Sequence, residues 1–232
     1  RELVHVGDVI LVVDIGGGTS DLSLISVTEE DGRLHLNRLA VGDHILLGGD
    51  NMDLALAHHM QDKLASKGHK LDSGQLLALN HACRTAKEAL LTDPKHATQP
   101  VTVLGRGSKL VGGTITPELP FEDIKTVLLE GFFPLVDADA ELQQGISLGL
   151  QEMGLPYAAD PVISKHLAQF LRSHAGVLKS HYEKTKQPAR ALPTAVLCNG
   201  GVFKARILQD RLLAQLNQWN REARVAPVRL LE

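Results

Sequence analysis

The stretch VILVVDIGGGTSDLSLISV, residues 9–27, constrains the fold more than any other part of the chain. Its opening apolar run is typical of a strand that is buried on both faces. The run leads into three consecutive glycines, and a second strand-like run, LSLISV, follows them. We therefore predict a β-hairpin with the glycines at its tip. After the turn EEDG, the alternation of LHLNRLAV, residues 34–41, predicts a third antiparallel strand.

Helical periodicity replaces this strand pattern in the middle of the chain. Helices are predicted over 52–67, from Asp72 or Ser73 to Asp93, over 120–136 and over 162–184. Short strands are predicted over 100–104 and 109–115. The segment 137–160 mixes periods and is predicted to be irregular with some helix.

The C-terminal part returns to strand-like sequence. The apolar run TAVLCN, residues 194–199, predicts a buried strand. The amphipathic stretch 203–219 predicts a helix, and APVRLLE, residues 226–232, predicts a last strand. The economical architecture is one α/β core built from both ends, with a helical lobe inserted between them. We expect a core lobe over 1–50 plus 190–232, a small lobe over 51–120 and a helical connection over 121–189.

Charge and cysteine content exclude several classes of protein. The formal net charge of −3 and the pI near 6.4 predict no basic surface for nucleic acid or anionic membrane. No apolar run approaches the length of a membrane span. The two cysteines, Cys83 and Cys198, lack metal-ligand spacing, which is typical of reduced, buried thiols in a cytoplasmic protein.

The glycine run does not match the two commonest phosphate loops. A Walker A loop needs a lysine near Gly18, and a dinucleotide fingerprint needs a helix after the glycines rather than a strand. A strand–glycine–strand tip can still present backbone N–H groups to an anion, and Thr19 adds a hydroxyl. Asp14 and Asp21 would repel a phosphate unless a cation or an attacking water lies between. The alternative is an ordinary hairpin tip with Asp and Ser as turn residues.

A second glycine pair, Gly200–Gly201, follows a buried strand and precedes a helix. Ligands of α/β proteins favour the carboxyl ends of strands, where a helix N-terminus points inward. Two glycine tips at the same edge of one sheet would make a nucleotide cradle. Taken alone, NGG is more often a plain turn between a strand and a helix.

Five segments carry a family resemblance. VVDIGGGTSDLSLI resembles the second phosphate motif of the seventy-kilodalton heat-shock chaperones, the DnaK family, within the actin-like ATPase superfamily. Similar matches follow in the same order and cover nearly the whole chain: VGDHILLGGDNMD, LNHACRTAKEALL, ITPELPFEDI and VLCNGGVFKARILQDRL. The resemblance implies an α/β fold of the actin-like ATPase (ribonuclease H-like) type, with an inserted, mainly helical subdomain.

The same resemblance implies ATP/ADP as the ligand, Mg²⁺ as the metal and K⁺ as a further candidate ion. Asp14 and Thr19 would act in catalysis by orienting water and the γ-phosphate, and Asp14 and Asp21 would help hold the ions. Gly48 and Gly49 would sit at a lobe hinge. The remaining nucleotide contacts would come from Gly16, Gly17, Gly18, Lys87, Gly200, Gly201 and Lys204.

Several positions depart from the family pattern. Arg84 stands where the family usually has an acid, Glu88 where it has a basic or neutral residue, and Leu91 where it has a serine. Val202 and Lys204 replace a Ser or Gln and an Arg. The stretch 138–193 is longer than the usual connection. These departures indicate a divergent subfamily.

The resemblance also implies that the chain is one lobe of a larger ATPase. The family's first phosphate motif, its catalytic lysine and its peptide-binding domain have no match here. We expect part of the ATP-binding domain of a molecular chaperone, with little ATPase activity by itself. Its expected partners are the missing N-terminal lobe, a nucleotide-exchange factor or cochaperone, and unfolded clients. A sugar-kinase-like phosphotransferase and a non-hydrolysing actin-like filament module remain alternatives.

Overall fold

The two ends of the chain build one sheet. The computed structural model describes residues 4–93, 96–104, 114–143, 158–186, 188 and 190–231. The sheet has five strands in the order β3-β2-β1-β6-β7. β1 (Val9–Ile15), β2 (Ser20–Glu30) and β3 (Arg33–Val41) form the predicted antiparallel meander. β6 (Ala195–Asn199) pairs parallel with β1, and β7 (Arg229–Leu231) pairs parallel with β6.

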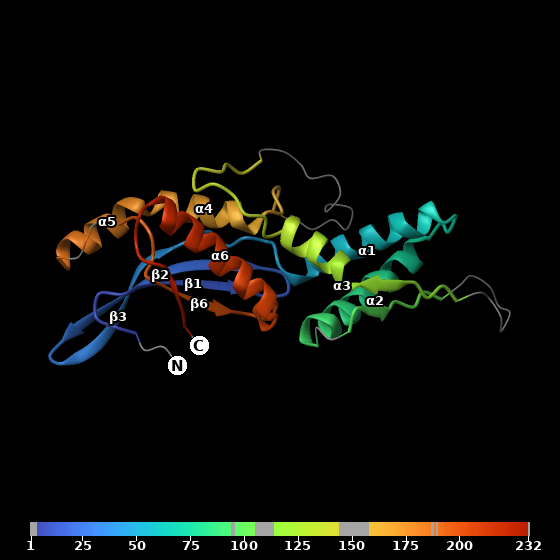
Figure 1. Cartoon of the computed structure of the whole chain (residues 1–232), viewed down its shortest axis with the longest axis horizontal. Helices are drawn as coiled ribbons and strands as arrows, with labels where there is room; N and C mark the ends of the chain where they lie inside the picture. Colours follow the sequence, from blue (N-terminus) through green and yellow to red (C-terminus); the bar gives the residue numbers. More distant parts are fainter. Residues whose placement is uncertain are drawn as a thin grey trace.

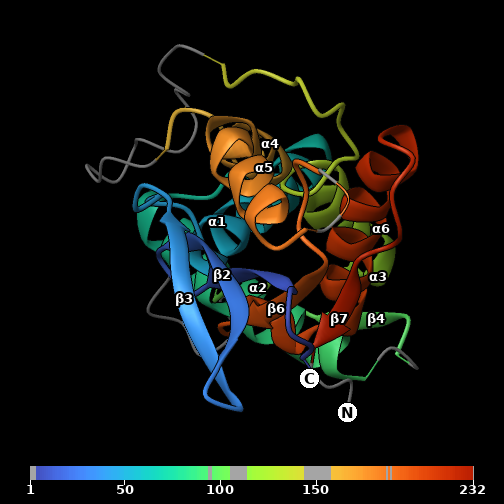
Figure 2. The same ribbon diagram turned by 90° about the vertical axis from the view of Figure 1, so that its left-hand side faces the viewer.

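Helices cover one face of this sheet. α4 (Ile163–Ser173), α5 (Ala175–Lys184) and α6 (Arg206–Glu222) lie on the same side of the strands, as Figure 2 shows. Alternate residues of β1, from Val9 to Ile15, point into the resulting core and are fully buried. The α/β fold class and the union of the two ends are therefore as predicted.

The helices that follow β3 form a mainly helical part at the other end of the molecule (Figure 1). It contains α1 (Gly49–Ser66) and α2 (Ser73–Thr92), followed by β4 (Thr98–Pro100) and β5 (Glu118–Pro120), which pair antiparallel. α2 begins with a capping box, in which the Asp72 carboxylate accepts from the Gln75 amide at 2.7 Å.

Several sequence predictions need correction. Of the predicted strand 100–104, only Pro100 belongs to a strand, β4, and Val103 forms an isolated bridge with Ile115. Of the predicted strand 109–115, only Thr114 and Ile115 are described. The predicted helix 162–184 is interrupted at His174, whose side chain Nδ1 and backbone N–H both contact the Phe170 carbonyl. The predicted helix 203–219 begins three residues later, after the 3-10 turn η2 (Val202–Lys204).

The predicted helix 120–136 is too long. The chain forms α3 (Phe121–Ile124) and the π-helical segment η1 (Lys125–Glu130), and neither continues past Gly131. Beyond it, Val136 is bound by a side chain of α6: Gln215 accepts from its amide at 2.7 Å and donates to its carbonyl at 2.9 Å. This tertiary pairing replaces the helical hydrogen bonds. Of the segment 137–160, residues 144–157 lie outside the described part.

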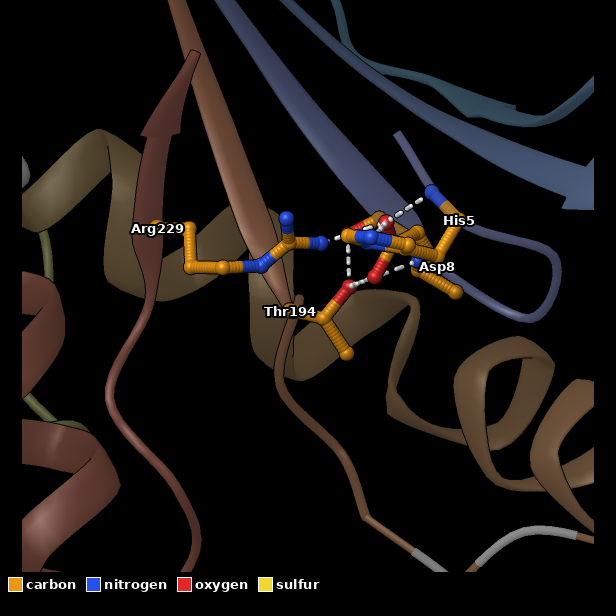
Figure 3. Close-up of polar contacts among 5 residues, drawn as sticks. His5, Asp8, Thr194 and Arg229 are labelled. Atoms are coloured by element: carbon orange, nitrogen blue, oxygen red, sulfur yellow. Dashed lines mark hydrogen bonds and ion pairs between the residues drawn. The ribbon is translucent and has the colours of Figure 1, made fainter. Parts of the chain in front are cut away.

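A buried carboxylate joins the start of β1 to β6 and β7 (Figure 3). Asp8 accepts hydrogen bonds from the His5 amide at 2.7 Å and from the Thr194 hydroxyl at 2.9 Å, and it pairs with Arg229. Burial alone would raise the pKa of Asp8, but the hydrogen bonds from Arg229, His5 and Thr194 outweigh it and lower the pKa below 3.8. This cluster ties strands that are far apart in sequence.

None of the described helices combines the length and apolar character that crossing a membrane would require.

Candidate functional site

The three glycines form the tip of the β1–β2 hairpin. Asp14 pairs with Asp21 and Ile15 with Ser20, so that Gly16 to Thr19 make the connection. The Gly16 amide donates to the Thr19 carbonyl at 2.8 Å, which closes a tight loop. The hairpin predicted from the sequence is confirmed at this point.

The start of α1 lies against this loop. The Gly49 amide donates to the Gly16 carbonyl at 3.0 Å, and the Asp50 amide donates to the Gly17 carbonyl at 2.7 Å. The Gly16 and Gly17 carbonyls are thus directed toward α1. Within the described residues, the amides of Gly17, Gly18 and Thr19 donate to no acceptor. A run of free N–H groups on a partly exposed glycine tip is the arrangement that binds an anion.

The two acidic candidates lie next to this tip. Asp14 and Asp21 are direct cross-strand partners, so their side chains project from the same face of the sheet. Two like charges in this position disfavour each other unless a cation is shared. Asp21 also contacts His44, with Oδ1 and Nδ1 separated by 2.8 Å. No group of three His, Cys, Asp or Glu residues in the described ranges could hold a metal ion.

Asp14 and Asp21 do not form a complete set of metal ligands, but Mg²⁺ does not require one from the protein. Mg²⁺ usually keeps several waters and is held by one or two carboxylates together with substrate phosphates. Asp14 and Asp21, beside free loop amides, provide the protein share of such a donor set. The residues present therefore fit a phosphate-bound Mg²⁺.

A cavity of about 400 Å³ opens between the loop, α1, α2 and the turn after β6. It brings together five of the predicted site residues, Gly16, Gly17, Lys87, Gly201 and Lys204. α2 lines it with Arg84, Lys87, Glu88, Leu91 and Thr92, whose spacing places them on one helix face. Asp14, Gly18, Thr19, Asp21 and Gly200 are not among its lining residues.

Gly200 is a position at which the backbone itself requires a glycine. Its φ is +88°, and a Cβ there would lie 2.2 Å from the Ile15 carbonyl oxygen and 2.8 Å from Asp14 Oδ1. Gly200 therefore packs against the end of β1 and the Asp14 carboxylate, whereas Gly201 borders the cavity. Because β1 and β6 are parallel neighbours, both glycine tips lie at the same edge of the sheet.

Lys87 is held by a residue that sequence reasoning missed. Its Nζ lies 2.6 Å from Asp53 Oδ1, and both side chains are buried. Burial raises the pKa of Asp53, and the neighbouring Lys87 ammonium lowers it, with the net effect upward. The lysine expected to reach a ribose thus borders the cavity while paired with α1. Asp53 is the last residue of the GGDNMD segment, but only the helix packing reveals its partner.

The departures from the family pattern gather in the same cavity. Arg84 lies between two carboxylates, with Nη1 at 3.5 Å from Asp50 Oδ1 and Nε at 3.4 Å from Glu88 Oε1. All three side chains are about half exposed or more. Val202 and Lys204 line the opposite wall. The cavity therefore combines an apolar part with charged groups of both signs at its surface.

Comparison with known proteins agrees with this geometry. A family model described as "Hsp70 protein" matches residues 5–138, more than half of the chain. The chaperone protein DnaK of Thermoplasma volcanium is 25% identical over 210 residues, which cover 88% of this chain and 33% of that protein. Heat shock cognate 70 kDa protein 3 of Dictyostelium discoideum is 37% identical over 84 residues, 35% of this chain and 13% of that protein.

The chain thus spans a third or less of the length of these curated relatives. The family match covers the glycine loop, α1, α2 and the cavity wall that they form. The α/β sheet with inserted helices is consistent with an actin-like ATPase lobe of this family. This chain belongs to the Hsp70 family.

Proposed function

We propose that this chain is part of the ATP-binding domain of a DnaK-like chaperone and binds the phosphates of ATP or ADP at the glycine tip. The observation that carries the proposal is the geometry of the loop 16–19. Its first two carbonyls are bound by α1, and the amides of Gly17, Gly18 and Thr19 are free among the described residues. Phosphoryl transfer depends mainly on positioning and charge stabilisation, which such amides supply.

Each predicted site residue has a proposed task within this function. Asp14 orients the attacking water or holds Mg²⁺ through water, and Thr19 positions the γ-phosphate. Asp21 binds an ion, Mg²⁺ or K⁺, together with Asp14. When bound, Mg²⁺ neutralises part of the phosphate charge. Gly16, Gly201 and Lys204 border the space for the nucleoside. The absence of a side chain at Gly200 leaves space for the Asp14 carboxylate.

Lys87 is proposed to act toward the ribose from its ion pair with Asp53. The pairing keeps the ammonium at the cavity wall, where a hydroxyl can accept from it. Lys204 covers the base less well than an arginine would, because its ammonium lacks the planar guanidinium face.

The domain organisation is also a proposal. Residues 1–50 with 190–232 would form the core lobe, 51–120 the inserted lobe and 121–189 the connection. The whole protein would add an N-terminal lobe and would work with an exchange factor or cochaperone on unfolded clients. In that protein this chain supplies one side of the nucleotide site.

The test is ATP hydrolysis by the full-length protein and by this chain alone. We expect Mg²⁺-dependent release of inorganic phosphate from the full-length protein, little from the chain alone, and a loss of about a hundredfold in kcat for Asp14→Asn. Transfer of phosphate to a sugar would instead identify a kinase. Nucleotide-dependent sedimentation without hydrolysis would identify a filament module. Robust hydrolysis by the chain alone would contradict the division of the site between two lobes.

A further inference from the structure

Gly48 occupies a position that no side chain could share with the glycine loop. A Cβ at Gly48 would lie 2.5 Å from the Gly17 carbonyl oxygen, 2.7 Å from the Gly16 carbonyl oxygen and 2.8 Å from the Gly17 carbonyl carbon. Its own backbone is extended, with φ −167° and ψ −158°, which any residue can adopt. Space alone therefore excludes a side chain, because the atoms in the way belong to the backbone of the loop.

This close approach brings the first amides of α1 onto the loop. A helix N-terminus has orphan N–H groups that often bind an anion directly. Here the Gly49 and Asp50 amides donate to the Gly16 and Gly17 carbonyls at 3.0 and 2.7 Å. The helix start is itself held, since the Gly48 amide donates to the buried side chain Oδ1 of Asn51 at 2.8 Å.

We infer that helix α1 orients the anion-binding loop, and that Gly48 is the positioning residue that allows it. The α1 amides take up the loop carbonyls, and this turns the amides of Gly17, Gly18 and Thr19 outward. The loop and the first turn of α1 therefore form one hydrogen-bonded unit. The inference rests on the proposed function only in naming phosphate as the ligand.

The first experiment needs no ligand. Amide hydrogen exchange is measured by NMR on this chain and on Gly48→Ala, with Gly49→Ala as the matched control. A Cβ at Gly49 would meet Val202 at 3.5 Å and the Gly16 carbonyl at 3.6 Å, which are ordinary contacts. We expect the Asp50 amide to exchange about tenfold faster or more in Gly48→Ala, and within about twofold of the parent in Gly49→Ala.

The amide chemical shifts of Gly18 and Thr19 should change in Gly48→Ala only, while the amides of β1 and β6 keep their protection and report an intact sheet. Unchanged exchange at Asp50 would overturn the inference. If Gly48→Ala does not fold, Asn51→Ala replaces it as the variant. This change frees the Gly48 amide without adding atoms, and it should accelerate exchange at Asp50 several-fold; no acceleration there would again overturn the inference.

The second experiment separates the positioning role from the ligand assignment. Binding of pyrophosphate in the presence of Mg²⁺ is measured by calorimetry on the same proteins. We expect Gly48→Ala to weaken binding about tenfold or more. If the parent chain binds no pyrophosphate but the exchange results hold, the coupling of α1 to the loop stands and the phosphate assignment fails. If the parent chain and Gly48→Ala bind pyrophosphate equally well, Gly48 is not a positioning residue and the proposed function stands.

Discussion

Asp8 and Asp53 are both buried carboxylates, and each has a cationic partner from a distant part of the chain. Their pKa values nevertheless move in opposite directions. Asp8 gains hydrogen bonds from a backbone amide and a hydroxyl besides Arg229, whereas Asp53 has Lys87 as its main partner and is more deeply enclosed. Asp53 therefore combines a larger desolvation with fewer donors, and its pKa rises, whereas the several donors around the less enclosed Asp8 outweigh its desolvation.

Asp8 should stabilise the fold at neutral pH and lose this role in acid. Its folded-state pKa is below 3.8, so its contribution is present above that pH and disappears as the pH falls through the folded value. We expect Asp8→Asn to lower the free energy of unfolding by about 2–3 kcal/mol at pH 7. Urea unfolding at pH 7 and below pH 3.8 measures this loss of stability. Asp31→Asn, in an exposed turn, is the control and should leave the free energy of unfolding nearly unchanged. If the stability difference between Asp8→Asn and the parent chain does not become smaller in acid, the Asp8 carboxylate does not have this stabilising role.

Lys87→Met should also be most destabilising at neutral pH, but here because Asp53 loses its cationic partner. Removal of the ammonium leaves the Asp53 carboxylate buried without its main partner, at a cost of about 3 kcal/mol at pH 7. The pKa of Asp53, already raised, rises further in the variant, so protonation relieves the penalty as the pH falls toward it. Unfolding between pH 7 and pH 5 tests this. The double variant with Asp53→Asn should lose the pH dependence, and a single variant equally unstable at both pH values would refute it.

At the scale of elements, the segment after β5 shows how packing sets a helix boundary. The apolar periodicity of 120–136 continues past the end of η1, but the chain leaves the helix at Gly131. Phe132 and Phe133 are buried in the core, and Val136 is held by Gln215 and Trp219 of α6. These contacts satisfy backbone groups that a longer helix would have paired within itself.

Gly131→Ala should therefore be costly. A Cβ at Gly131 would lie 2.3 Å from the Val127 carbonyl oxygen, so the π-helical turn must shift. We expect a loss of about 2 kcal/mol or more in the free energy of unfolding. Gly176→Ala is the control, because a Cβ there has nothing within 4 Å and should be neutral or stabilise α5 by about 0.5–1 kcal/mol. Urea unfolding of both variants tests the difference. If Gly131→Ala were as stable as Gly176→Ala, the π-helical turn would accept a Cβ without cost and the prediction would be wrong.

At the scale of the whole molecule, one apolar cluster extends from the sheet into the inserted helices. It includes Leu11 of β1, Met60 of α1, Leu79 of α2, Leu119 of β5 and Trp219 of α6. The ion pair between α1 and α2 and the contacts of α1 with the glycine loop add to this continuity. The proposed core and inserted lobes therefore share a core rather than having one each.

We expect the chain to unfold in one cooperative step. Trp219 is the only tryptophan and is buried against Val136, so its fluorescence reports the core lobe. Far-UV circular dichroism also reports α1 and α2. The urea midpoints of the two signals should coincide, as for a two-state domain. A separate, earlier circular dichroism transition would show that the inserted helices unfold independently.

Much of the fold could be predicted because its signals are local. The apolar run of β1, the glycine tip and the start of α2 after Asp72 each depend on a few neighbouring residues. The break at His174 and the end of η1 could not be predicted in this way. Their periodic patterns continue, and contacts with other elements decide where the helices stop.

In the candidate site, too, the features with local signals could be predicted and the contacts between distant elements could not. Sequence patterns were sufficient to predict a glycine hairpin with flanking carboxylates, a second glycine pair at the end of another strand, and segments that resemble one family in order. The contacts of α1 with the Gly16 and Gly17 carbonyls, of Gly200 with Asp14 and of Lys87 with Asp53 became visible only in the packed molecule. A hairpin or a cap is stabilised by bonds between near neighbours in the sequence. The direction of an amide or an ammonium depends on atoms that are brought close only when the strands and helices pack.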